Sequence, residues 1–201
     1  MEKKLNICPY MIDLTPNIIL SKPQLGENIG STARAMKNFG IEKLRLIEPR
    51  DGWPNSSAYA ISAGAGDVLN KINVFKSLEE ATKDISLLFA TTARKRVIGT
   101  KSLDVFEAID KSFHHVVNGG KAGFLFGPEQ SGLSNDDVVK ADYTISIPLN
   151  QNFSSLNLSQ AVLLICWEWN KVKMSHFKED NLPTKVNKKL KKSTEISNVG
   201  D

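Results

Sequence analysis

Three short segments of the chain carry residue types that could bind a polar ligand and act on it. The first segment places Asn28 and Arg34 on a predicted helix. The second places Glu129 directly after a Gly-Pro turn, and the third brings Ser155 and Asn157 to the start of an apolar helix. Amide, hydroxyl and carboxylate groups offer several hydrogen bonds, and a guanidinium holds anions. The set therefore suits a ligand-binding site.

The first segment, PQLGENIG, follows a predicted strand and opens a helix with one apolar face. Asn28 is expected to cap the start of this helix. Arg34 belongs to a polar strip on the same helix, together with Ser31, Lys37 and Asn38. Local sequence therefore fits both a surface arginine and a catalytic one.

The second segment, FLFGPEQSGL, runs from an apolar strand into a turn, where Gly127 and Gly132 are typical turn glycines. Glu129 would either face a cationic ligand or lie in solvent as a loop acid. In the third segment, IPLNQNFSSLN, a polar loop leads to a helix start that Ser154 or Ser155 would cap. The free backbone amides of a helix start can hold a ligand, and main-chain groups of the loop could hold an adenine edge.

Short apolar runs alternate with amphipathic stretches along most of the chain. The predicted strands are Asn17–Leu20, Leu44–Ile47, Ile85–Ala90, Gly123–Gly127 and Thr144–Pro148. The predicted helices are Ile29–Phe39, Ser77–Lys83, Leu103–Phe113, Asn135–Lys140 and a long one from Ser155 to Lys173. This alternation predicts an α/β fold with a mostly parallel sheet and helices on both faces. Ligands in such sheets bind beyond the carboxyl ends of the strands, where the three segments are expected to lie.

Several common sites are missing from the sequence. It has neither a G-x-x-x-x-G-K-[ST] phosphate loop nor a G-x-S-x-G nucleophile motif, and Gly64-Ala65-Gly66 lacks the third glycine of a dinucleotide fingerprint. The adjacent His114 and His115 lack the partners of a metal site, so no metal is expected. Local chemistry alone therefore supports a ligand-binding α/β domain and no finer assignment.

The net charge of +4 is concentrated at the C-terminal end of the 201 residues. From Asn170 onward there are eight lysines and four acidic residues, whereas the preceding part is neutral. Five of the eight residues in Lys185–Lys192 are lysine, which suits non-specific contacts with RNA phosphates. We therefore expect one domain, residues 1–174, and a short basic tail, residues 175–201, that orders on RNA or is disordered.

The cysteines and the apolar stretches indicate the cellular compartment in which the protein is expected. Cys8 and Cys166 form no CxxC pair, which favours a reduced, cytoplasmic protein over a disulfide-stapled one. The longest apolar stretch, Ala161–Trp167, is too short to cross a bilayer, and the first residues do not resemble a secretory signal. No membrane partner is expected.

Three segments resemble, in order, the motifs of the SpoU branch of SPOUT RNA methyltransferases: NIGSTARAMKNFG, FLFGPEQSGLSNDDV and IPLNQNFSSLNLSQAV. Within that branch, the further segments ATTARKR and WEW are similar to tRNA methyltransferases of the TrmJ type. The resemblance covers roughly residues 17–173. It implies a homodimeric, S-adenosyl-L-methionine (SAM)-dependent RNA ribose 2′-O-methyltransferase. The implied target is tRNA, at the cytidine or uridine of anticodon-loop position 32.

The resemblance also implies a fold and a set of site residues. The C-terminal part of the sheet would thread through a loop and form a deep trefoil knot that binds SAM. The implied cofactor contacts are Thr91, Thr92, Gly127, Glu129, Ile147, Leu149, Ser155 and Leu156. The implied catalytic residues are Arg34, Ser155, Asn28 and Asn157, with Arg34 acting on the ribose across the dimer interface. RNA contacts are expected from Arg34, Lys37, Arg94, Lys188 and Lys189.

Two alternatives stay open at this point. The substrate is alternatively rRNA, or tRNA at another position. The second alternative is a non-catalytic RNA-binding protein with the same fold. The presence of Arg34, Glu129, Ser155 and Asn157 favours a catalytically competent site over this second alternative.

Overall fold

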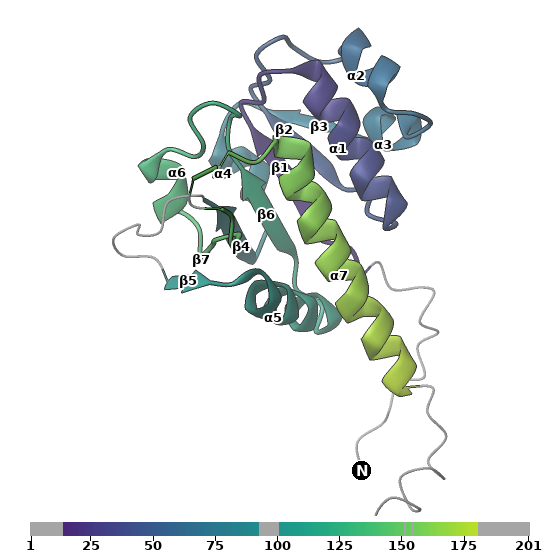
Figure 1. Ribbon diagram of the computed structural model, residues 1–201, viewed down its shortest axis with the longest axis vertical. Helices are drawn as coiled ribbons and strands as arrows, with labels where there is room; N and C mark the ends of the chain where they lie inside the picture. Colours follow the sequence, from purple (N-terminus) through teal and green to yellow (C-terminus); the bar gives the residue numbers. More distant parts are fainter. Residues whose placement is uncertain (1–13, 93–100, 151, 154, 181–201) are drawn as a thin grey trace, which may run out of the picture.

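The computed structural model describes residues 14–92, 101–150, 152–153 and 155–180, and its centre is a parallel sheet (Figure 1). The strands are β1 (Asn17–Ser21), β2 (Leu44–Ile47), β3 (Asn73–Phe75), β4 (Leu87–Thr91), β5 (Lys101–Leu103), β6 (Ala122–Phe126) and β7 (Tyr143–Ile145). Their order is β3-β2-β1-β6-β4-β7-β5, and every neighbouring pair is parallel. Because parallel strands share a direction, the loops at their carboxyl ends meet along one edge of the sheet.

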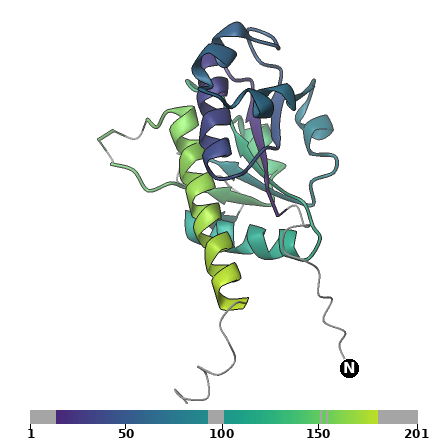
Figure 2. The ribbon, with the colours of Figure 1, turned by 90° about the vertical axis from the view of Figure 1, so that its right-hand side faces the viewer.

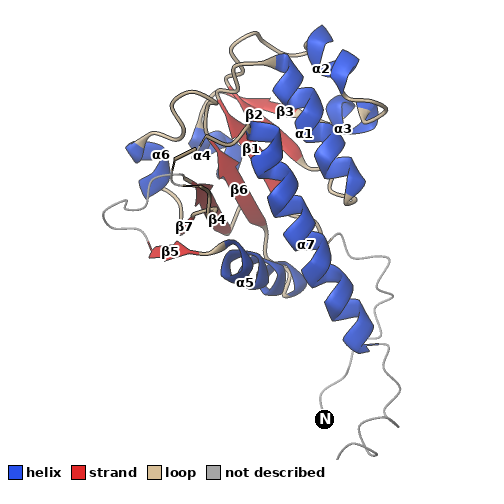
Figure 3. Ribbon diagram, viewed as in Figure 1, coloured by secondary structure: helices blue, strands red, loops and turns tan. Residues whose placement is uncertain are grey.

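Alternate side chains of the central strands enter two cores on opposite faces of the sheet, each covered by helices (Figure 3). In β1, Ile18 and Leu20 join one core, and Ile19 joins the other. Phe124 and Leu125 of β6 divide in the same way. Because both faces of these strands are buried, their sequences are continuous apolar runs rather than alternating ones.

Three long helices cover the first face: α1 (Gly26–Asn38), α5 (Val105–Val117) and α7 (Leu158–Asp180). α1 and α7 pack side by side across the sheet (Figures 1 and 2). Trp169 of α7 is fully buried, with its ring edge-on to Phe113 of α5 and to Phe124 of β6. Its indole N–H donates to the carbonyl of Leu14 at 3.2 Å, so a single side chain joins α7 to a helix, the sheet and the segment that precedes β1.

Four short helices complete the layers. α2 (Ser56–Ile61) and α3 (Gly66–Asn70) pack against α1 and extend the first core through Ala58 and Val68. α4 (Leu78–Thr82) and α6 (Asn135–Val139) cover the second face through Leu78 and Val138. Among the helices described, none has the length and apolar character needed to cross a membrane.

The predicted α/β alternation and parallel sheet are confirmed, with some boundaries moved. The strand predicted at Thr144–Pro148 runs from Tyr143 to Ile145, so the residues up to Pro148 lie beyond the strand. Leu103 lies in β5 rather than in a helix, because Asp104 forms a capping box that starts α5 after it. The elements α2, α3, β3 and β5 are short and were not predicted.

The last helix also differs from its prediction. It begins at Leu158 rather than at Ser155, and it continues to Asp180 rather than ending near Lys173. The predicted domain end at residue 174 therefore falls inside α7. The deep trefoil knot remains a prediction, because part of the segment that would thread it lies outside the described residues.

One ion-pair cluster joins the strands to the second helical layer. Arg45 of β2 donates to both carboxylate oxygens of Asp84, at 2.5 and 3.0 Å, and to the carbonyl of Ala81 at the end of α4. Lys121 also contacts Asp84, at 3.0 Å. The hydrogen bond from Arg45, assisted by Lys121, holds the pKa of Asp84 well below its usual value.

Replacing Asp84 with Asn tests this cluster through its pH dependence. Because the folded-state pKa is depressed, Asp84 contributes stability above its unfolded pKa of roughly 4 and loses it as the pH falls further. We expect Asp84→Asn to lower the free energy of unfolding by about 1 kcal/mol at neutral pH. Urea unfolding of both proteins should show this difference shrinking below about pH 4. A difference that stays constant across this range would contradict the assignment.

Candidate functional site

A cavity of about 320 Å³ lies at the carboxyl ends of β4 and β6, where the second and third segments meet. Its lining residues are Thr91, Thr92, Phe126, Gly127, Pro128, Glu129, Gln130, Ser131, Gly132, Leu133, Ser155, Leu156, Leu158 and Ala161. Hydroxyl, carboxylate and main-chain groups thus stand beside apolar side chains. This size and mixture are typical of small-molecule sites.

Glu129 anchors the loop that forms most of this cavity. Its carboxylate accepts hydrogen bonds from the backbone N–H of Gln24 at 2.8 Å and of Leu25 at 3.3 Å. It also accepts from the side-chain amide of Asn28, at 2.7 Å. A negative charge at the amino end of α1 is favourable, because unpaired N–H groups and the helix dipole both point toward it. The carboxylate therefore joins the first segment to the second.

A chain of amides extends this link to the third segment. The Asn157 amide donates to Oδ1 of Asn28 at 3.0 Å, and Asn157 Oδ1 accepts from the backbone N–H and the hydroxyl of Ser159, at 2.9 and 2.7 Å. The hydrogen bonds thus run in one direction, from Ser159 through both asparagines to Glu129. The three segments are brought together by these side chains, which lie beside the cavity.

Both helix-cap predictions for these segments are wrong. Leu25 occupies the cap position of α1, while Asn28 lies within the first turn, only 7% exposed, and bonds to Glu129. At α7, the side chain of Asn157 accepts from the helix N–H of Ser159, as a capping residue does. Asn157 takes this role because the loop continues past Ser155, so the serine is free to line the cavity.

Gly127 allows the two ends of the loop that forms the cavity wall to touch. A Cβ at this position would lie 2.3 Å from the backbone nitrogen of Leu133 and 2.4 Å from the carbonyl carbon of Gly132. Gly132 itself has a φ of 66°, which favours glycine. The loop therefore folds back on its own start, and its main-chain groups reach the cavity without side chains between them.

Arg34 lies outside this cavity. It is exposed on α1 and lines a separate hollow of about 240 Å³ with Ser31, Ala35, Asn38, Ile61, Ser159, Gln160 and Leu163. In the part of the chain that the structure describes, no hydrogen bond or ion pair of the Arg34 guanidinium is found. Ser159 contacts Asn157 and also borders this hollow, so the two sites are neighbours across the start of α7.

The other predicted residues divide into three groups. Six of the eight predicted cofactor contacts line the cavity, whereas Ile147 and Leu149, in the segment after β7, do not. Lys37 is paired with Asp67 at 2.6 Å and lines neither hollow. Arg94, Lys188 and Lys189 lie outside the described residues. Leu158 and Ala161 of α7 line the cavity but were not singled out, since their helical spacing marks them only as buried-face positions.

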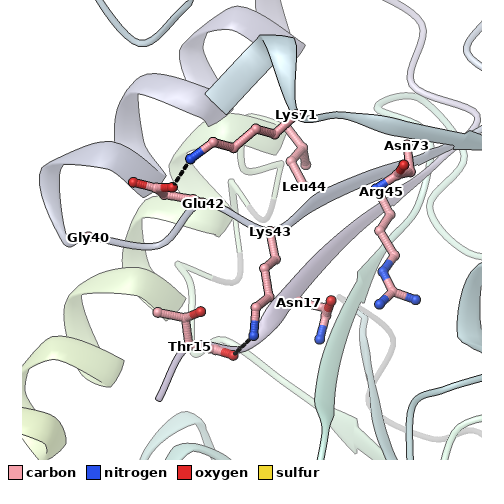
Figure 4. Close-up of a pocket in the computed structure, with 9 residues that line it drawn as sticks. All are labelled: Thr15, Asn17, Gly40, Glu42, Lys43, Leu44, Arg45, Lys71 and Asn73. Carbon is pink, nitrogen blue, oxygen red and sulfur yellow. Dashed lines mark hydrogen bonds and ion pairs between the residues drawn. The ribbon is translucent and has the colours of Figure 1, made fainter. Parts of the chain in front are cut away.

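A larger hollow of about 410 Å³ lies at the opposite, amino ends of β1, β2 and β3 (Figure 4). Its cations are engaged: Lys71 pairs with Glu42, Lys43 donates to the carbonyl of Thr15, and Arg45 holds Asp84. Ligand sites of open α/β sheets lie at the carboxyl ends of the strands. The cavity beside Glu129 is therefore the better candidate site.

Comparison with known proteins gives consistent matches. Residues 15–167 match the SpoU rRNA Methylase family. The tRNA (cytidine/uridine/adenosine-2′-O-)-methyltransferase TrmJ of Pseudomonas aeruginosa is 34% identical over 178 residues, which is 89% of this chain and 67% of that protein. The tRNA (cytidine/uridine-2′-O-)-methyltransferase TrmJ of Sodalis glossinidius is 38% identical over 75% of this chain and 58% of its own length.

A solved structure agrees in fold. TrmJ from Z. mobilis ZM4 is 48% identical to this chain, with a TM-score of 0.74, over 78% of this chain and 69% of that one. The chain spans about 58–67% of the length of the two curated relatives above.

Glu129→Gln tests the link between the segments. The amide keeps one acceptor oxygen and loses the charge, so at least one of the three donors around Glu129 loses its acceptor. We expect a loss of about 1.5–3 kcal/mol in the free energy of unfolding. As a control, Glu80→Gln affects an exposed carboxylate that, among the residues the structure describes, accepts from the N–H of Lys76 alone, and should cost about 0.3–1 kcal/mol. Urea titrations that give equal losses would contradict the assigned role of Glu129.

Proposed function

Because this chain belongs to the SpoU rRNA methylase family, we propose that it transfers a methyl group from SAM to a ribose 2′-oxygen of tRNA. The observation that carries the proposal is the cavity beside Glu129, built from the two loops that resemble the family's second and third motifs. The tRNA substrate rests on the names of the TrmJ relatives. We further propose anticodon-loop position 32, with cytidine or uridine, as the target.

The cavity residues fit SAM as the methyl donor. Thr91, Thr92, Glu129 and Ser155 offer polar contacts, Leu156 and its apolar neighbours offer a surface for the adenine, and the close turn at Gly127 exposes main-chain groups. When bound, SAM supplies an electrophilic methyl group to a nucleophile placed opposite its sulfur. The protein's part is to hold both reactants in line, and positioning can contribute ~7–11 kcal/mol in well-oriented cases.

Arg34 is proposed to act on the target ribose. A ribose hydroxyl must lose its proton as it attacks, but a guanidinium is not deprotonated in proteins and cannot be the base. We therefore assign Arg34 to clamp the target phosphate or the developing alkoxide, while the proton leaves through that phosphate or water. Asn28 and Asn157 contact Glu129 and each other, so we assign them to position the cavity loops rather than to react.

We propose that the working site combines two copies of the chain. Arg34 lines a separate hollow rather than the cavity of its own chain, which is consistent with the resemblance, in which this arginine acts on the ribose from a second copy. Exposed apolar side chains lie in and beside the hollow that Arg34 lines. Ile61 and Leu163 line this hollow, and Leu164 and Trp167 follow on α7, each of the four being 38–47% exposed. Burial of this surface in a homodimer would stabilise the pair, since exposed apolar patches mark interaction sites.

The proposal is tested by incubating the protein with labelled SAM and total RNA from cells that lack it, followed by nucleoside mapping. A 2′-O-methylated nucleotide at tRNA position 32 is the expected product. Methylation of rRNA would support the second candidate, which the family description favours. No methylated nucleoside in any RNA would overturn the catalytic assignment.

Arg34→Lys separates a clamp from a general base. Lysine keeps the charge but cannot form the paired hydrogen bonds of a guanidinium, so we expect kcat/KM to fall about a hundredfold. The affinity for SAM, measured by calorimetry, should stay unchanged, because Arg34 lies outside the cavity. Near-wild-type turnover with a pH profile shifted toward acid would instead support a base at this position.

The basic tail is proposed to add non-specific contacts with tRNA through Lys188 and Lys189. Deleting the residues after Asn181 should weaken tRNA binding and flatten its dependence on salt, because fewer counterions are released. Affinity for SAM should be unaffected. Equal tRNA affinity of the full and shortened chains at low salt would exclude this role.

A further inference from the structure

Arg50 lies on a fixed turn at the carboxyl end of β2. The turn closes with a hydrogen bond from Gly52 N–H to the Pro49 carbonyl at 3.0 Å. Gly52, the last residue of the turn, has a φ of 76°, which favours glycine. The backbone N–H of Arg50 donates to the Pro23 carbonyl at 3.1 Å, which joins the turn to the segment before α1. The guanidinium is thus carried by an anchored backbone.

The residues that follow this turn are also held in place by packing. Trp53 is partly buried against the first core and stacks on Tyr59 of α2, with ring centres 5.9 Å apart. Asn55 caps α2 through Ala58 and lies so close to Gly26 that a Cβ there would be 2.1 Å from its Oδ1. The loop between β2 and α2 therefore has little freedom to move away from α1.

Arg50 lies close to the cofactor cavity. Its backbone contacts Pro23, and the next residue, Gln24, donates to Glu129. The pKa of Arg50 is raised, chiefly by its hydrogen bond to Asp51 and in smaller part by the negative charge of Glu129. The guanidinium is therefore within electrostatic range of the carboxylate that lines the cavity.

The guanidinium of Arg50 is accessible to solvent, and its ion-pair partner, Asp51, can be replaced by another anion. Its side chain is 54% exposed and donates to both carboxylate oxygens of Asp51, at 2.9 and 3.2 Å. An exposed ion pair of this kind contributes little to stability, so its exchange costs little. A phosphate diester presents two oxygens in the same forked geometry and with the same charge.

From this placement we propose that Arg50 binds a backbone phosphate of the RNA strand that carries the target ribose, displacing Asp51. The proposal rests on the proposed function, because it takes the RNA to enter at the cavity of Glu129. A cation on an anchored backbone at this edge would fix the strand's register over the cavity rather than read its bases.

Three variants test the proposal in the full chain, with a fluorescently labelled, unmodified tRNA transcript as the probe. Arg50→Ala should weaken tRNA binding about tenfold at low salt and reduce the salt slope by about one ion. Asp51→Asn should tighten binding, because the guanidinium no longer has a competing carboxylate. The control, Lys71→Ala, removes an equally exposed cation paired with Glu42 at the opposite edge (Figure 4), and should change binding far less.

Thermal melts of all variants exclude misfolding as the cause of any loss. An Arg50→Ala protein that binds tRNA like the Lys71→Ala protein would overturn the proposal, as would weaker binding by Asp51→Asn. Methyl transfer by the wild-type protein is measured in parallel. Absence of transfer would defeat the proposed function, whereas the order of the three tRNA affinities would still decide the role of Arg50.

Discussion

The carboxylate of Glu129 is the contact on which the arrangement of the site depends. It accepts from two backbone N–H groups at the start of α1, about a hundred residues away in the chain, and from the side chain of Asn28. A charged acceptor meets the unpaired donors of a helix start, so both partners gain from the contact. It ties the loop that forms the cavity directly to the beginning of α1.

The parallel sheet makes this contact possible. β1 and β6 are adjacent, so the loops that leave their carboxyl ends begin side by side even though α1 to α5 separate them in sequence. The third segment lies between β7 and α7, and the Asn157–Asn28 hydrogen bond joins it to the first segment. Strand order thus brings the segments near one another, and a few polar side chains fix their final geometry.

The sequence predicted the sheet and the loop after β6 that lines the cavity, because apolar runs and turn residues are local signals. The cofactor contacts followed from the family resemblance and stay a prediction, although six of the eight residues line the cavity. Every residue from Phe126 to Leu133 lines the cavity, as the strand-turn pattern indicates. The partners of Glu129 were not predictable, since a contact between Glu129 and Gln24 depends on strand order and not on spacing. The cap prediction for Asn28 failed for a similar reason, since Asn28 lies in the first turn of α1 and donates to a carboxylate distant in sequence. The cap prediction for the third segment failed because α7 begins later than its sequence pattern indicates.

The chain of amides from Ser159 to Glu129 also limits how the sequence can change during evolution. An asparagine has one donating and one accepting end, so each member's orientation is set by its neighbour. An aspartate at position 28 or 157 would turn a donor into an acceptor and set two acceptors against each other. A substitution at one position of the chain therefore requires a compensating change at its hydrogen-bond partner, so these positions are expected to change together or stay constant.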